Sequence, residues 1–281
     1  MTTDVEPIAG PGAPAPTRRV GRGSGVPGVV VVAAIIAFAF LVLPLVGLVQ
    51  QVRWGGLVDD LTTPEAMAAL RLSIVCSLWA TFFAVVLGVP LAWVLARVTF
   101  PGRSLVRALT LLPMVVPPVV GGVGLFYAFG RDGLVGQYLS DWFGVQLTFS
   151  AAGAVMAETF VAMPFLVVTV EAALRSVDRR YEDAAATLGA GRFEVFRRVT
   201  LPLIRPGLIA GAALAWARAL GEFGATITFA GNIQGRTQTM PLAVYLLLES
   251  HPQVAIGLSI VLVAVCVGVL ALLRDRWFGV G

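Results

Sequence analysis

The sequence predicts an all-α integral membrane protein with six transmembrane helices and both termini in the cytoplasm. Of its 281 residues 58% are hydrophobic and only 13% are charged, with a mean hydropathy of +0.88, whereas soluble domains carry about 25% charged residues. Apolar runs of about 20 residues recur along the chain, which is the length that crosses the hydrocarbon core of a bilayer. A backbone in lipid must satisfy its own hydrogen bonds, so these runs are expected to be helices.

The chain divides into a short tail and a membrane domain. Residues 1–26 are rich in Pro, Gly and Ala and are expected to form a disordered cytoplasmic tail. The first apolar run exceeds the 7–15 apolar residues of a signal peptide, so we expect a retained helix. Residues 27–281 form the membrane domain, with predicted spans at about 27–50, 70–96, 105–129, 150–174, 204–230 and 253–273.

The third predicted span is interrupted by helix-breaking residues. The stretch "LLPMVVPPVVGGVG" contains Pro113, Pro117, Pro118 and the glycines 121, 122 and 124. Such a segment is expected to kink or unwind, which is tolerated against protein or along a water-filled path. Close helix packing through small residues explains the glycines equally well.

The basic residues fix the expected orientation. All 20 are arginines. Fifteen of them fall on the side of the two termini, Arg218 lies within a predicted span, and four lie on the other side: Arg53, Arg71, Arg131 and Arg236. Cytoplasmic loops carry the excess of basic residues. Because the chain has no lysine, it cannot form a P-loop for a nucleotide or a Schiff base. Any ATP used on its behalf must be hydrolysed by another chain. The single histidine, His251, excludes a multi-histidine metal site.

A polar insert at about 175–203 separates the fourth and fifth predicted spans. Asp178 is expected to cap a first short helix, and Gly189 and Gly191 to end it. A second helix is expected from Arg192, with Leu201-Pro202 ending it before the fifth span. This order of helix, turn and helix indicates a cytoplasmic docking surface. An amphipathic element lying on the bilayer is the alternative.

The insert resembles the "EAA" loop of ABC-importer permeases of type I architecture, which has the pattern Glu-Ala-Ala, three residues, Gly, nine residues, Ile, one residue, Leu-Pro. Here an aspartate replaces the glutamate and a valine replaces the isoleucine, while Glu182 lies next door and leaves the identity of the key acid open. The resemblance implies a coupling helix that docks on a separate ATP-hydrolysing subunit. Its residues are Glu182, Asp183, Ala184, Ala185, Gly189, Val199, Leu201 and Pro202.

Three ionisable residues lie within predicted spans, namely Glu158, Arg218 and Glu222. Charges at that depth are costly and usually face the protein interior or a water path. Arg218 and Glu222 are four residues apart and can pair on one helix face. The pair either holds the bundle together or lies beside the substrate path, where Arg218 would attract an anion.

The segment from Ala217 to Tyr245 resembles molybdate permeases in "GEFGA" (221–225), in the turn 230–232 and in "RTQTMPL" (236–242). The resemblance implies a molybdate-importer permease in a bacterial cytoplasmic membrane, with Gly224, Glu158, Arg218 and Glu222 along the substrate pathway. It further implies a homodimer, two ATP-binding subunits that hold ATP and Mg²⁺, and an extracytoplasmic molybdate-binding protein. No cofactor, metal or nucleic acid is expected on this chain, and no catalysis.

Other transport functions stay open. Sulfate and thiosulfate permeases share the "GEFGA"-like part, and tungstate cannot be distinguished from molybdate by sequence. A proton-coupled secondary transporter would instead use Glu158 and Glu222 to carry protons.

Overall fold

The computed structural model describes residues 27–277, with side chains up to residue 273, and every regular element in this range is a helix. The predicted tail at residues 1–26 lies outside the described residues. The chain divides into two units, one ending at Gly47 and one starting at Leu48, which are described separately. Helix α1 (Gly28–Gln50) belongs mostly to the first unit; it is apolar along its whole length and confirms the first predicted span.

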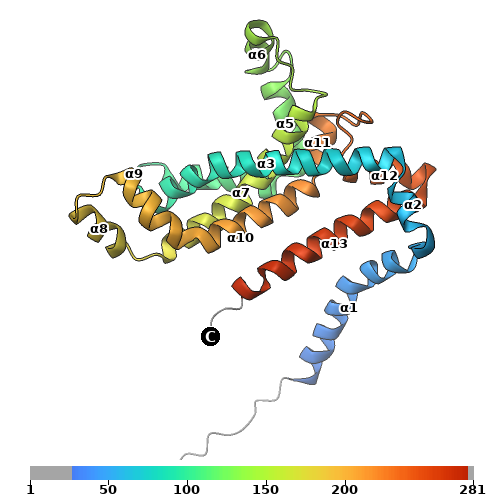
Figure 1. The fold of residues 1–281 in the computed structure, drawn as a ribbon, viewed down its shortest axis with the longest axis horizontal. Helices are drawn as coiled ribbons and strands as arrows, with labels where there is room; N and C mark the ends of the chain where they lie inside the picture. The colour runs from blue at the N-terminus through green and yellow to red at the C-terminus, as the bar shows by residue number, and fades with distance from the viewer. Residues whose placement is uncertain (1–26, 278–281) are drawn as a thin grey trace, which may run out of the picture. The chain divides into compact units, whose positions relative to one another are not determined.

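Four long helices dominate the second unit (Figure 1). They confirm the second, fourth and sixth predicted spans and most of the fifth. In the range that the structure describes, five helices are long and apolar enough to cross a membrane, or six with one bent pair counted. The four are α3 (Pro64–Arg97), α7 (Ala151–Ser176), α10 (Leu201–Leu220) and α13 (Pro252–Trp277).

Small residues form the contact between α3, α7 and α10. The core there includes Ala84, Ala92, Ala162 and Ala215, all fully buried. At Gly88 an added Cβ would lie 2.9 Å from a methyl carbon of Leu166, too close to fit without movement. Lipid offers no hydrophobic drive for helix association, so close van der Waals packing through small residues holds these helices together.

The interruption predicted in the third span is confirmed, and it is severe. The chain bends by 117° between helix α4 (Arg103–Val115) and helix α5 (Pro118–Phe129). The prolines explain the break, because Pro117 and Pro118 cannot donate backbone hydrogen bonds. The glycines explain the packing: an added Cβ on Gly122 would lie 2.8 Å from the Ala225 carbonyl oxygen. α5 therefore lies directly against the segment that follows α10.

The fifth predicted span, 204–230, is not one helix. α10 ends at Leu220, and α11 (Gly224–Phe229) starts after a break of three residues. Glu222 stabilises the break, because its Oε1 accepts a hydrogen bond from the Ala225 N–H, 2.8 Å away, at the start of α11. The apolar composition of the segment concealed this break.

Most of the shorter elements lie at the two ends of the bundle, whereas α6 lies beyond α5 (Figure 1). α8 and α9 lie at the end where α3 finishes, and α2 and α12 lie at the opposite end (Figure 1). The sequence analysis did not predict α2, α6 or α12. The short elements are a 3₁₀ turn at Trp54–Gly56, α2 (Leu57–Leu61), α6 (Gly136–Phe143), α8 (Arg180–Thr187), α9 (Arg192–Val195), a π-helical turn at Phe196–Thr200 and α12 (Met240–Ser250).

Candidate functional site

The polar insert folds as two short helices joined by a tight turn, as predicted. Asp178 accepts a hydrogen bond from the Arg180 N–H at 3.0 Å, which supports the start of α8. Gly189 has a φ of +89°, a conformation that residues with a Cβ avoid, and it follows the end of α8. Gly191 has an ordinary φ of −68° and precedes α9. Only one of the two glycines is therefore required by backbone geometry.

The predicted end of the second helix at Leu201-Pro202 is wrong. α9 passes through the π-helical turn at Phe196–Thr200 directly into α10. Pro202 lies in the first turn of α10, directly after the π-helical turn. The wider turn before it closes with a hydrogen bond from the Leu201 N–H to the Phe196 carbonyl. The insert and the long helix α10 are thus one helical path.

Glu182 joins three elements at this end of the bundle. Its Oε1 accepts hydrogen bonds from the Arg97 guanidinium at 3.0 Å and from the Thr200 hydroxyl at 2.9 Å. Arg97 lies in the last turn of α3 and Thr200 immediately before α10. Arg97 also donates to the Val177 carbonyl at 3.3 Å. We call the contacts among these four residues the Glu182 junction.

The two candidate acids of the coupling loop differ in their exposure and in their contacts. The side chain of Glu182 is 18% exposed and faces the junction, whereas Asp183 is exposed. The outer side of the insert presents Tyr181, Leu188 and Phe193, which are exposed by 60%, 89% and 75%. Of the remaining predicted loop residues, Ala184, Gly189 and Pro202 are exposed, and Ala185, Val199 and Leu201 are half-buried.

A small pocket of about 250 Å³ lies between α8 and the helical path that leads to α10. Glu182 and Asp183 line it, together with Trp93 from α3 and Phe196 from the π-helical turn. The insert therefore borders an open hollow.

A second group of charges at the same end was missed by the sequence analysis. Glu171 on α7 forms ion pairs with Arg107 of α4 and with Arg175 one turn further along α7. The Arg107 guanidinium also donates to the Leu95 carbonyl near the end of α3. The spacing of Glu171 and Arg175, four residues apart where the polar insert begins, was the available signal. We call the end that contains this group and the Glu182 junction the arginine-rich end.

Within the membrane-spanning part, Arg218 and Glu222 form the predicted pair. The Arg218 Nη1 atom lies 2.6 Å from Glu222 Oε2. Glu222 lies beyond the end of α10, so the predicted single helix face is wrong although the pair is present. The Glu222 side chain is 1% exposed and the Arg218 side chain 28%. Arg218 is thus the accessible member of the pair.

Glu158 lies on α7 and is 1% exposed. It is close enough to Glu222 for the two carboxyl charges to interact. Its Oε2 atom is buried and has no hydrogen-bond partner in the structure. The structure brings the two predicted acids together but leaves Glu158 without a positive partner among the described ion pairs.

Gly224 starts α11 and packs against the start of α5. An added Cβ would lie 2.8 Å from Pro118 Cβ and 3.0 Å from the Val119 nitrogen. This contact explains the residue type, because any side chain would push the two helices apart.

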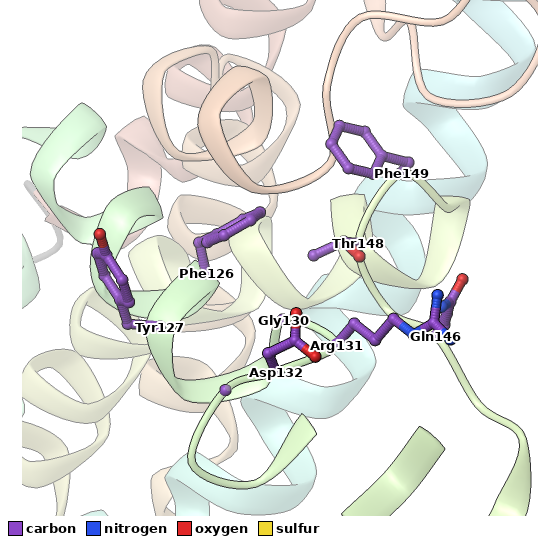
Figure 2. A pocket seen from close by; sticks show the side chains of 9 residues that line it. Phe126, Tyr127, Gly130, Arg131, Asp132, Gln146, Thr148 and Phe149 are labelled. Carbon is purple, nitrogen blue, oxygen red and sulfur yellow. The ribbon is translucent and has the colours of Figure 1, made fainter. Parts of the chain in front are cut away.

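A larger pocket of about 430 Å³ lies where α5 ends and the chain approaches α7 (Figure 2). Its lining includes none of the predicted site residues. Aromatic rings and a few polar groups surround it: Phe126, Tyr127, Gly130, Arg131, Asp132, Gly133, Gln146, Thr148 and Phe149. Among the described residues there is no cluster of His, Cys, Asp and Glu that could hold a metal ion.

Residues 84–280 match the family model described as the inner membrane component of binding-protein-dependent transport systems. The chain belongs to this family. The permease is therefore a non-catalytic, multi-pass inner membrane subunit of an ABC transporter, and the family works with an ATPase and a periplasmic binding protein. No cofactor is expected in this chain.

Individual relatives agree with this assignment. The chain is 48% identical over 232 residues to the molybdenum transport system permease protein ModB of Mycobacterium tuberculosis, covering 83% of this chain and 88% of that protein. It is 39% identical over 229 residues to the sulfate transport system permease protein CysT of Salmonella typhimurium, covering 80% and 82%. A solved bacterial ABC transporter that imports alginate has the same fold, with a TM-score of 0.70 at 20% identity, over 90% of this chain and 95% of that one.

Proposed function

We propose that this permease imports molybdate. The observation that carries the proposal is the higher identity to a molybdenum permease, 48%, than to a sulfate permease, 39%, over similar lengths. Sulfate is the second candidate cargo, because both anions are tetrahedral dianions and both relatives cover most of the chain.

In the proposed assembly two copies of the chain form the translocation pathway in a bacterial cytoplasmic membrane. Two ATP-binding subunits, which hold ATP and Mg²⁺, dock at the cytoplasmic face, and a molybdate-binding protein docks at the other face. The excess of arginines supports a cytoplasmic position for the arginine-rich end and both termini.

The insert is the proposed docking element. Its exposed outer side carries Tyr181, Leu188 and Phe193 beside the small residues Ala184 and Gly189, so a partner can bury apolar area there. Substitution of Gly189 by glutamate adds a charge and strains a backbone with φ +89°. The variant is expected to lose co-purification with the ATPase while still inserting in the membrane, whereas Gly191→Glu, at an ordinary φ, is the matched control for the charge.

For the pathway, we assign the anion contact to Arg218. The Arg218 side chain is 28% exposed, while Glu158 and Glu222 are almost fully buried. In this proposal Glu222 orients Arg218, and Gly224 keeps α11 against α5. A single accessible positive charge favours an anion without binding it tightly, as rapid passage requires.

The test is uptake of labelled molybdate by proteoliposomes that contain the permease, its ATPase subunit and the binding protein. We expect uptake only with ATP, with stronger competition by unlabelled molybdate than by sulfate. Stronger competition by sulfate would assign the permease to sulfate. Uptake by the permease alone, driven by a proton gradient, would contradict the proposal and support a secondary transporter.

A further inference from the structure

Glu182 is the meeting point of helices that are distant in sequence. Its carboxylate holds Arg97, 85 residues earlier in the chain, and Thr200, 18 residues later. Arg179 adds a reverse contact, because it donates a hydrogen bond to the Arg97 carbonyl at 3.2 Å. α8 is thus connected to the end of α3 and to the start of α10 through one side chain.

The junction is shielded from solvent. The Arg97 and Glu182 side chains are 8% and 18% exposed, and Thr200 is 1% exposed. Salt screens exposed pairs strongly and shielded pairs much less. Removal of one member of a shielded pair leaves the other charge without compensation. The contacts therefore constrain the position of α8 more than a surface ion pair would.

The junction lies on the inner side of an element whose outer side is exposed. Tyr181 and Leu188 of the insert are exposed by 60% and 89%. The π-helical turn that ends at Thr200 is a feature that recurs at functional sites in helices. A displacement applied to the outer side of α8 must pass through its inner contacts to reach the long helices.

From these contacts we infer that Glu182 is a positioning residue that transmits movement of α8 to α3 and α10. This inference rests on the proposed function, in which an ATPase moves α8. The exposed neighbour Asp183 contributes no side-chain bond to the junction among the described contacts, so the inference gives the two acids separate roles: Asp183 is accessible to the partner, and Glu182 connects the insert to the bundle.

The experiment measures molybdate uptake and ATP hydrolysis together in the reconstituted complex and takes their ratio. Glu182→Gln removes the charge from the junction. Glu194→Gln is the matched control, because Glu194 also pairs with an arginine at 3.0 Å, Arg198, but on one exposed helical turn. We expect Glu182→Gln to co-purify with the ATPase and to lower uptake per ATP by about fivefold or more, the lower end of measured coupling between sites. Glu194→Gln should behave like the unmodified complex.

If Glu182→Gln does not assemble, Thr200→Val removes one bond to Glu182 and keeps both charges; it should assemble and still lower the ratio. An unchanged ratio of uptake to ATP hydrolysis in an assembled Glu182→Gln, or in Thr200→Val, overturns the inference.

If the unmodified complex shows ATP-driven uptake of sulfate and not of molybdate, the cargo proposal fails and the ratio is measured with sulfate. If it shows no ATP-driven uptake of either anion, the proposed function fails and the inference fails with it.

Discussion

The arginine-rich end and the intramembrane charges are both built from pairs of arginine and glutamate, but the pairs connect different parts of the chain. At the arginine-rich end, Arg97 and Glu182 are 85 residues apart, and Arg107 and Glu171 are 64 apart, so each pair ties two helices together. Inside the membrane, Glu222 holds Arg218, four residues away, and the Ala225 N–H, three residues away. The first group fixes helices against one another, and the second shapes one local break. Of these two groups of charges, the first joins helices that are distant in the sequence.

The largest effect on stability is expected from packing inside the membrane. A side chain at Gly122 must displace the backbone around Ala225, so Gly122→Val should lower the stability by about 3 kcal/mol. Gly124 on the same helix has open space around it, and Gly124→Val is the matched control for helix propensity. Thermal unfolding in detergent measures both. Equal losses would mean that α5 is not held by the α11 contact.

The next effect separates a bond between helices from a bond within one helix. Both Arg107 and Arg175 pair with Glu171, the first from α4 and the second from α7 itself. Arg107→Gln should cost about 1.5–3 kcal/mol, the value of a charge-assisted hydrogen bond. Arg175→Gln should cost about 0.5 kcal/mol or less, because Arg175 is half exposed and pairs on its own helix. Thermal unfolding of the two variants compares them, and the reverse order would contradict the distinction between the two regions.

Glu222→Gln is expected to have little effect on assembly and a clear effect on transport. The amide oxygen of glutamine can still accept the bond from the Ala225 N–H, so the break before α11 should persist. Arg218 loses its counter-charge and binds the anion differently. Uptake should change more than the yield of the assembled complex. Normal uptake in this variant would mean that the Arg218–Glu222 pair stabilises the structure and takes no part in transport.

The smallest effect is expected from Glu158→Gln. One carboxylate oxygen of Glu158 is buried without a partner, so an amide of the same shape should change stability by less than about 1 kcal/mol. ATP-driven uptake should stay near the unmodified rate, because the permease needs no proton carrier. Abolished uptake, with assembly intact, would support the proton-coupled alternative.

Much of the fold follows from apolar length alone, because lipid requires helices of about 20 residues. That rule does not predict where a helix ends inside an apolar segment. The break after Leu220 depends on a bond from Glu222 to a backbone N–H, and the bend after α4 on two adjacent prolines. Only the second has a sequence signal strong enough to predict.

In the candidate site, too, the features set by local sequence could be predicted and the contacts between distant helices could not. The spacing of the insert predicted two helices and the positive-φ Gly189, since these depend on local sequence. It could not distinguish Glu182 from Asp183, because the direction of each side chain depends on Arg97, which is 85 residues away. The ion pair of Arg107 and Glu171 was missed for the same reason. Bonds between distant helices require the tertiary structure.

The most direct test of the account is a double-mutant cycle on the Glu182 junction. Molybdate uptake per ATP is measured for Arg97→Gln, Glu182→Gln and the double variant in the reconstituted complex. Residues that act through one contact show strongly non-additive effects. The account predicts that the double variant is no worse than the more affected single variant. Losses that multiply independently, or single variants that keep the unmodified ratio, would contradict it.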